Sequence, residues 1–113
     1  MNKITREELK KKLDEGQNFK LVNCLDDWAF RGKRIPGSIH FENMRHALEM
    51  LKPSDLVIAY CSNPGCTASV LVCQQLSEQG FQNVWHYAGG IAEWEDAGYP
   101  MEGDWVNQKK SDA

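Results

Sequence analysis

The residue best placed for chemistry is Cys61, because it directly follows a short apolar run, residues 56–60. A continuous apolar run of this length is typical of a strand buried on both faces of a parallel sheet. Residues 62–65 favour a loop, and a helix is predicted over residues 67–79, ended by Gly80. A cysteine at this junction lies at the carboxyl edge of the sheet, where open α/β sheets bind their ligands.

The strand-loop-helix junction suits nucleophilic chemistry. Loop amides and the positive end of the helix that begins near Thr67 stabilise an anion, whether a thiolate or a bound oxyanion. Free cysteine has a pKa of about 8.5, and such a site lowers it by about one unit or more. Cys61 is therefore a candidate nucleophile near neutral pH, and the alternative is a buried structural cysteine.

The rest of the chain alternates predicted strands and helices. The capping box Thr5-Arg6-Glu7-Glu8 begins the first helix. Apolar patterns and turn residues predict strands over residues 19–25, 38–41, 56–60 and 83–87, and helices over residues 6–15, 43–51, 67–79 and 91–97. This alternation predicts an α/β domain with a central, mostly parallel sheet flanked by helices.

Length and composition describe an ordinary globular domain. The chain has 113 residues, 42% hydrophobic, and its 13 basic and 16 acidic side chains give a formal charge of −3. That balance indicates neither a nucleic-acid nor a membrane partner, and no apolar run approaches a membrane span. The start of the chain does not resemble a secretory signal, so we expect a reducing, cytoplasmic setting.

Three further segments accompany the strand that leads to Cys61. The four segments, in chain order, are Leu21-Val22-Asn23-Cys24, Arg34-Ile35-Pro36-Gly37-Ser38-Ile39-His40, Val57-Ile58-Ala59-Tyr60-Cys61 and Asn83-Val84-Trp85-His86-Tyr87-Ala88-Gly89-Gly90-Ile91-Ala92-Glu93-Trp94. They resemble, in order and spacing, the first core strand, the Ile-Pro-Gly bend, the strand before the catalytic cysteine and the closing Gly-Gly-x-x-x-Trp turn of the rhodanese domain family. The resemblance implies a single rhodanese-like domain over residues 4–100 and a C-terminal tail, residues 101–113, that shows no pattern.

The resemblance also implies a function, sulfur transfer by double displacement. Cys61 takes a sulfane sulfur from a small donor or a persulfide-bearing protein, holds it as a persulfide, and passes it to a thiol acceptor. No cofactor or metal is expected, because a terminal persulfide sulfur is an anion that needs hydrogen-bond donors. The substrate-binding residues implied are Ser62, Asn63, Pro64, Gly65 and Thr67.

The loop itself differs from the common rhodanese pattern, which has an arginine just after the cysteine, a glycine at the third position and often an arginine or threonine at the fifth. This loop has neither arginine, and Pro64 has no amide to donate. We therefore predict that thiosulfate, a dianion, is a poor donor compared with a polysulfide or a protein persulfide. Asn23-Cys24-Leu25 likewise stands where the family usually has Asp-Val-Arg, so a supporting ion pair is missing.

Cys66, five positions beyond Cys61, is a second candidate catalytic residue. It could attack a persulfide on Cys61, either receiving the outer sulfur or displacing it and leaving a disulfide. It could equally be a small residue that fills space at the start of the helix. The sequence leaves both open, because a disulfide needs Cα atoms about 4.4–6.8 Å apart.

Other functions compete with sulfur transfer. A phosphatase or arsenate reductase normally has an arginine at the sixth position after the cysteine, where this chain has Thr67. A dithiol oxidoreductase would cycle Cys61 and Cys66 between dithiol and disulfide without bound sulfur. A noncatalytic rhodanese-like interaction module would not need the nucleophile.

The remaining cysteines and histidines are expected to have no catalytic role. Cys73 lies within a predicted helix and Cys24 within a predicted strand, so both are interpreted as core packing. The histidines, His40, His46 and His86, show no metal-ligand spacing, and we expect no zinc site.

Overall fold

The computed structural model describes residues 2–63 and 65–106. In chain order the helices and strands are β1 (Asn2–Lys3), α1 (Arg6–Asp14), β2 (Lys20–Asn23), α2 (Asp27–Gly32), α3 (Met44–Met50), β3 (Val57–Tyr60), α4 (Ala68–Glu78), β4 (Val84–Tyr87) and α5 (Gly90–Asp96).

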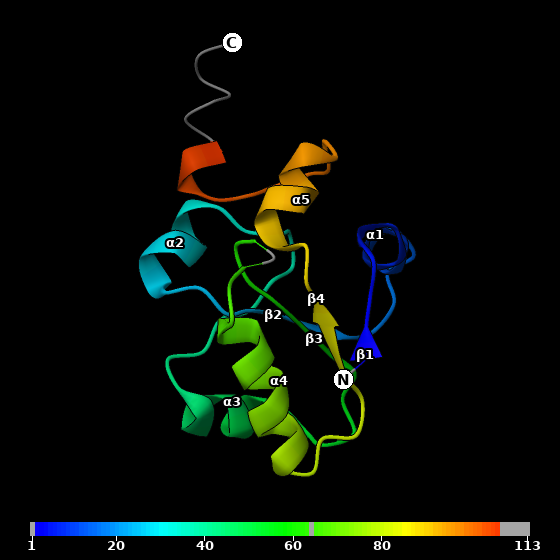
Figure 1. Ribbon diagram of the computed structural model, residues 1–113, viewed down its shortest axis with the longest axis vertical. Helices are drawn as coiled ribbons and strands as arrows, with labels where there is room; N and C mark the ends of the chain where they lie inside the picture. Colours follow the sequence, from blue (N-terminus) through cyan, green and yellow to red (C-terminus); the bar gives the residue numbers. More distant parts are fainter. Residues whose placement is uncertain (1, 64, 107–113) are drawn as a thin grey trace.

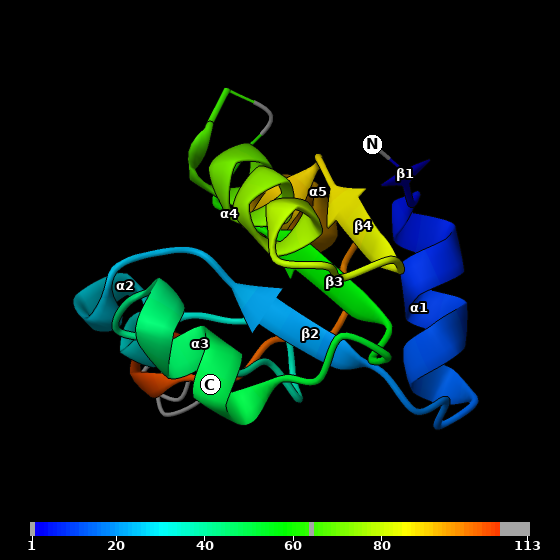
Figure 2. The same ribbon diagram turned by 90° about the horizontal axis from the view of Figure 1, so that it is seen from below.

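A parallel sheet of four strands, in the order β1-β4-β3-β2, forms the centre of the described part of the chain. Helices cover both of its faces, with α3 and α4 on one side and α1 on the other (Figure 2). The prediction of an α/β domain with a mostly parallel sheet is therefore confirmed. β3 is fully buried because β2 and β4 flank it and both faces are covered, which explains its unbroken apolar sequence.

The side chains of the sheet form two cores, one on each face. The core under α1 and α5 contains Leu21, Ile58, Tyr60 and Tyr87 with Trp94 of α5. The core under α3 and α4 contains Val22, Val57, Ala59 and Val84 of the strands with Leu76 of α4. The alternation of side chains along each strand produces this division.

In the described residues, side chains cap the starts of α1, α2 and α3, but not those of α4 and α5. The predicted capping box at α1 is present, since Thr5 and Glu8 each accept from the other's amide. Asp26 caps α2 and Asn43 caps α3 in the same manner. α5 begins after Gly89, which has no side chain to cap it, and Thr67 at the start of α4 makes no side-chain cap. The first turn of α4 thus keeps amides that no side chain caps.

The sheet differs from the sequence prediction in three places. β2 is shorter than predicted, because the chain turns where the amide of Leu25 donates to the side chain of Asn23. The predicted strand over residues 38–41 is wrong, since Ile39 alone pairs, through an isolated bridge with Val22. The edge strand β1 was not predicted, because a two-residue strand is too short to show an alternating pattern.

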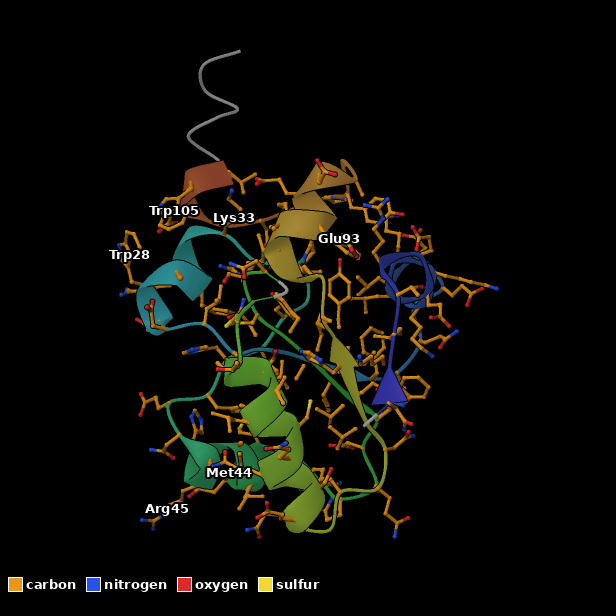
Figure 3. All side chains as sticks on the ribbon, in the orientation of Figure 1. Trp28, Lys33, Met44, Arg45, Glu93 and Trp105 are labelled. Atoms are coloured by element: carbon orange, nitrogen blue, oxygen red, sulfur yellow. A yellow bond between two sulfur atoms is a disulfide. The ribbon has the colours of Figure 1, made fainter. Side chains whose placement is uncertain are left out.

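The beginning of the predicted tail packs on the domain. The backbone of Glu102 pairs with that of Arg34, and the ring of Trp105 covers Gly32 and meets Trp28 edge-on (Figure 3). The division at residue 100 remains a prediction, and residues 107–113 of the predicted tail lie outside the described residues.

No helix in the described part of the chain is both long and apolar enough to cross a membrane.

Candidate active site

Cys61 is the first residue after β3, at the carboxyl edge of the sheet. The register pairs Tyr60, the last residue of β3, with Asn23 of β2 and Tyr87 of β4. The described residues of the loop after β3, 61–63 and 65–67, lie between the start of α4 and the start of α5 (Figure 1). The predicted position of Cys61, at the end of a buried central strand, is therefore confirmed, although its chemical role remains a prediction.

The first turn of α5 holds the backbone of this loop. The amide of Ile91 donates to the carbonyl of Cys61 (3.1 Å), and the amide of Ala92 donates to that of Ser62 (2.8 Å). Gly90 has φ +66°, and a Cβ built on it would lie within 2.9 Å of three backbone atoms of residues 61–63. Gly90 is thus required both by its conformation and by the close approach of the loop.

The structure joins Cys61 and Cys66 in a disulfide. Their Cα atoms are 6.2 Å apart, within the usual range for a disulfide. Cys61 is buried, whereas Cys66 is half-buried. The distance that the sequence left open is therefore short enough for the two sulfurs to react with each other.

The other predicted binding residues lie on the same loop. Ser62 is half-buried, and Asn63, Gly65 and Thr67 are exposed. Two loop amides donate to Asn63 within the loop. The amide of Gly65 donates to Oδ1 of Asn63 (2.9 Å), and the amide of Cys66 donates to the backbone carbonyl of Asn63 (3.1 Å). Pro64 lies outside the described residues. Binding of a substrate by these residues remains a prediction.

The phenol of Tyr60 organises a buried polar network beneath the loop. Its oxygen accepts hydrogen bonds from Nδ2 of Asn23 (2.9 Å) and from the amide of Ile35 (3.1 Å). Oγ of Ser38 lies 2.6 Å from the same oxygen and 2.6 Å from the carbonyl of Ile35. Ser38 has one proton, which goes to that carbonyl, so Tyr60 donates its own proton to Ser38. Burial raises the pKa of Tyr60, and the phenol stays neutral.

This network replaces the ion pair that the family pattern would place here. Asn23 donates to Tyr60 while its Oδ1 accepts from the amide of Leu25 (2.8 Å), so the side chain links two segments without charge. The sequence analysis missed Tyr60 as a positioning residue. The available signal was a tyrosine at the end of an otherwise apolar buried run, because a buried phenol needs a hydrogen-bond partner.

A second buried pair lies on the other face of the sheet. Oγ of Ser69, in the first turn of α4, lies 2.7 Å from Nε2 of His86 on β4. Burial lowers the pKa of His86, and the positive charge of Lys3 lowers it further. The pair fixes the start of α4 against β4. Sequence reasoning also missed it, because the two residues are 17 positions apart and no local pattern reports their contact.

Cys24 and Cys73 lie in or against the core under α3 and α4, as the packing interpretation predicts. Burial raises the pKa of Cys24 to about 12 and that of Cys73 to about 11, so both remain thiols at neutral pH. Cys24 also lines a cavity of about 370 Å³ beside the end of β2, together with His40 and Val72. In the part of the chain that the structure describes, no group of three His, Cys, Asp or Glu side chains is arranged to hold a metal ion.

Comparison with known proteins gives consistent similarities. The family model of the rhodanese-like domain matches residues 5–97. The thiosulfate sulfurtransferase GlpE of Actinobacillus succinogenes is 32% identical over 89 residues, which are 76% of this chain and 78% of that protein. GlpE of Pseudomonas syringae pv. syringae is 32% identical over 91 residues, covering 76% of this chain and 80% of that protein.

Solved structures show the same fold. The BH2092 protein of Bacillus halodurans superposes with a TM-score of 0.84 at 22% identity, over 92% of this chain and 78% of that chain. The rhodanese-like domain of the Alr3790 protein of Anabaena sp. gives a TM-score of 0.83 at 23% identity, over 94% of this chain and 82% of that domain.

Proposed function

The chain belongs to the rhodanese-like domain family, and we propose that it is a sulfurtransferase that carries sulfane sulfur as a persulfide on Cys61. The observation that carries the proposal is the position of Cys61, at the end of the buried central strand and at the base of a loop that leads into the uncapped start of α4. Membership of the family and the GlpE relatives support sulfurtransferase activity in general.

The proposed reaction is a double displacement. The Cys61 thiolate attacks the outer sulfur of a donor and takes it, and the rest of the donor leaves with the bonding electron pair. An acceptor thiol then attacks the outer sulfur of the persulfide and restores the Cys61 thiolate. The persulfide anion is stabilised by loop amides and by the first turn of α4, where no side chain competes for the amides. A reducing, cytoplasmic compartment is part of the proposal, because only reduced Cys61 can accept sulfur.

The donor that we propose is a polysulfide or the persulfide of a partner protein, and the acceptor is a thiol. The GlpE relatives are named for thiosulfate, but the described loop residues, like the whole segment 62–67 in sequence, carry no cationic side chain. A dianion entering this loop meets amide dipoles without a full positive charge, which weakens its binding.

One set of assays tests the proposal. Wild type and Cys61→Ser are each incubated with polysulfide, with thiosulfate and with a persulfide-bearing protein, and transfer to cyanide or to a thiol is measured. We expect transfer by wild type from polysulfide and from the protein persulfide, with thiosulfate at least about tenfold slower, and no transfer by Cys61→Ser. Circular dichroism controls for folding. Activity in a folded Cys61→Ser variant would contradict the assignment, and a preference for thiosulfate would contradict the donor class.

The disulfide favours a second candidate function, a dithiol oxidoreductase that cycles Cys61 and Cys66 without bound sulfur. The intact mass of Cys66→Ala after treatment with a sulfane donor separates the two functions, because this variant cannot form the disulfide between the two cysteines. A carrier gains the mass of one sulfur atom, removable by cyanide, whereas a pure oxidoreductase gains no removable sulfur.

A further inference from the structure

A persulfide carrier needs only one cysteine, yet this loop holds a second cysteine bonded to the first. Cys66 follows Cys61 by five positions, and the structure closes the disulfide between them. Sulfur transfer to an external acceptor does not use Cys66, so its position needs a separate explanation.

We propose that Cys66 is a resolving thiol that converts the sulfur held on Cys61 into sulfide, so that the chain reduces sulfane sulfur at the expense of a dithiol reductant. This inference rests on the proposed function, because it requires Cys61 to carry a persulfide. It changes the product from a sulfur-bearing acceptor to hydrosulfide, and it adds a partner class, a dithiol.

The step balances in atoms and electrons. The Cys66 thiolate attacks Sγ of Cys61, forming the bond between the two Sγ atoms. The proton that the Cys66 thiol gives up as it becomes a thiolate passes to the outer sulfur of the persulfide anion. The bond from Sγ of Cys61 to the outer sulfur breaks, and the outer sulfur leaves as hydrosulfide with the electron pair. The two cysteines are oxidised by two electrons in total, and the sulfane sulfur is reduced by two. A dithiol then reduces the disulfide by thiol-disulfide exchange, becomes a disulfide itself and returns both cysteines to thiols.

The geometry favours attack on the inner sulfur over capture of the outer one. Cys66 reaches Sγ of Cys61 itself, and the 6.2 Å between the Cα atoms is the normal separation for that bond. Capture of the outer sulfur would require the Cys66 sulfur to lie about 2 Å farther from Sγ of Cys61, which means a more open loop. Hydrosulfide also leaves more readily than an ordinary alkyl thiolate, because its conjugate acid is the stronger acid.

The backbone of the loop keeps the two cysteines close. Ile91 and Ala92 hold the carbonyls of Cys61 and Ser62 from α5, and the amide of Cys66 donates to the carbonyl of Asn63. These hydrogen bonds involve backbone groups and do not depend on the disulfide. Reduction therefore frees the side chains while the loop retains its shape, and a rotation of the Cys66 side chain restores the reactive approach.

Of the three cysteines other than Cys61, Cys66 has the environment that suits a resolving thiol. Cys24 follows the strand next to β3, but burial raises the pKa of its thiol to about 12, and the pKa of Cys73 is raised to about 11. A resolving cysteine must ionise near neutral pH, and these two do not. Cys66 is half-buried and immediately precedes Thr67 at the start of α4.

The test follows the fate of a single loaded sulfur. Wild type, Cys66→Ala, Cys66→Ser and the matched control Cys24→Ala are reduced, loaded with inorganic polysulfide and desalted. Each is then kept without any added thiol, while released sulfide is assayed and the intact mass and peptide map are followed. Circular dichroism checks folding, and a dilution series separates an intramolecular step from reaction between molecules.

We expect wild type and Cys24→Ala to release about one sulfide per loaded Cys61 and to gain the disulfide, at a rate independent of protein concentration. Both Cys66 variants should keep the persulfide at least about tenfold longer, because the intramolecular attack is lost. Equal persulfide lifetimes without a disulfide in wild type would overturn the inference, as would sulfur mapped to Cys66. If none of the proteins loads Cys61, the proposed function itself fails, so the two failures are distinguishable.

Discussion

The two faces of the sheet secure the loop in different ways. Under α1 and α5, the buried polar groups make short directional hydrogen bonds, as between Tyr60 and Asn23 (2.9 Å) and between Tyr87 and Glu93 (3.1 Å). Under α3 and α4, the thiols of Cys24 and Cys73 make long contacts with backbone carbonyls (3.8 and 3.7 Å), and Ser69 and His86 form a short buried polar pair (2.7 Å).

This difference separates a face that fixes the backbone of the loop from a face that tolerates substitution of its thiols. The first face supplies the glycine contact and the amides that hold the loop backbone, and these groups take no part in the proposed sulfur transfer. The second face carries the two thiols, Cys24 and Cys73, which tolerate substitution better because they satisfy few directional bonds. The comparison predicts large effects for changes on the first face and small ones for thiols on the second.

Gly90→Ala should have the largest effect. Alanine at φ +66° is strained, and its Cβ would collide with the backbone of residues 61–63, so we expect a loss of about 3 kcal/mol or more in the free energy of unfolding. Chemical denaturation measures it. Gly98→Ala is the matched control, because Gly98 has φ +76° with nothing within 4 Å of a built Cβ. Equal losses in the two variants would show that the loop contact contributes nothing.

Tyr60→Phe should rank second. The change leaves the buried Nδ2 of Asn23 and the amide of Ile35 without their acceptor, which costs about 2–3 kcal/mol of stability. Denaturant midpoints measure the loss. Tyr99→Phe is the control, since no hydrogen bond from the Tyr99 hydroxyl is found among the described residues, and we expect a change within about 0.5 kcal/mol. A neutral Tyr60→Phe would mean that the network does not stabilise the fold.

Tyr60 also illustrates which features of the structure could be predicted from the sequence and which could not. Apolar runs, the capping box and the Gly-Gly turn predicted the main helices, the three longer strands and the position of Cys61, because these features depend on local pattern. The network of Tyr60 joins residues up to 37 positions apart in sequence, which no local pattern reports. The approach of Cys66 to Cys61 depended on the path of the loop, which its residue types did not determine.

His86 should give the second face a measurable pH dependence. Its pKa lies below the usual value of 6.5 because the residue is buried, so the unfolded chain binds the proton more readily than the folded one. Stability is therefore full above pH 6.5 and falls as the pH drops from 6.5 toward the lowered pKa. Unfolding free energies of wild type and His86→Gln, measured across this range, check the prediction. The variant should show a shallower slope, and an unchanged slope would assign the pH dependence to other groups.

Cys24→Ala should have the smallest effect of all, although Cys24 follows the strand paired with β3. Its amide donates to the carbonyl of Tyr60, but this bond belongs to the backbone and survives the substitution. Because burial raises the pKa of the thiol to about 12, almost none of it is ionised at neutral pH, and it cannot compete for sulfur.

We expect the Cys24→Ala variant to transfer sulfur within about twofold of wild type. We expect its loss of stability to be about 1 kcal/mol or less, since one sulfur atom is removed from a half-buried site. Transfer rates measured beside Cys61→Ser give the comparison, and alkylation of the reduced wild type at mildly alkaline pH should label Cys61 and Cys66 well before Cys24. A large loss of transfer in a folded Cys24→Ala variant would bring the thiols of the second face into the reaction and remove the division between a fixed face and a tolerant one.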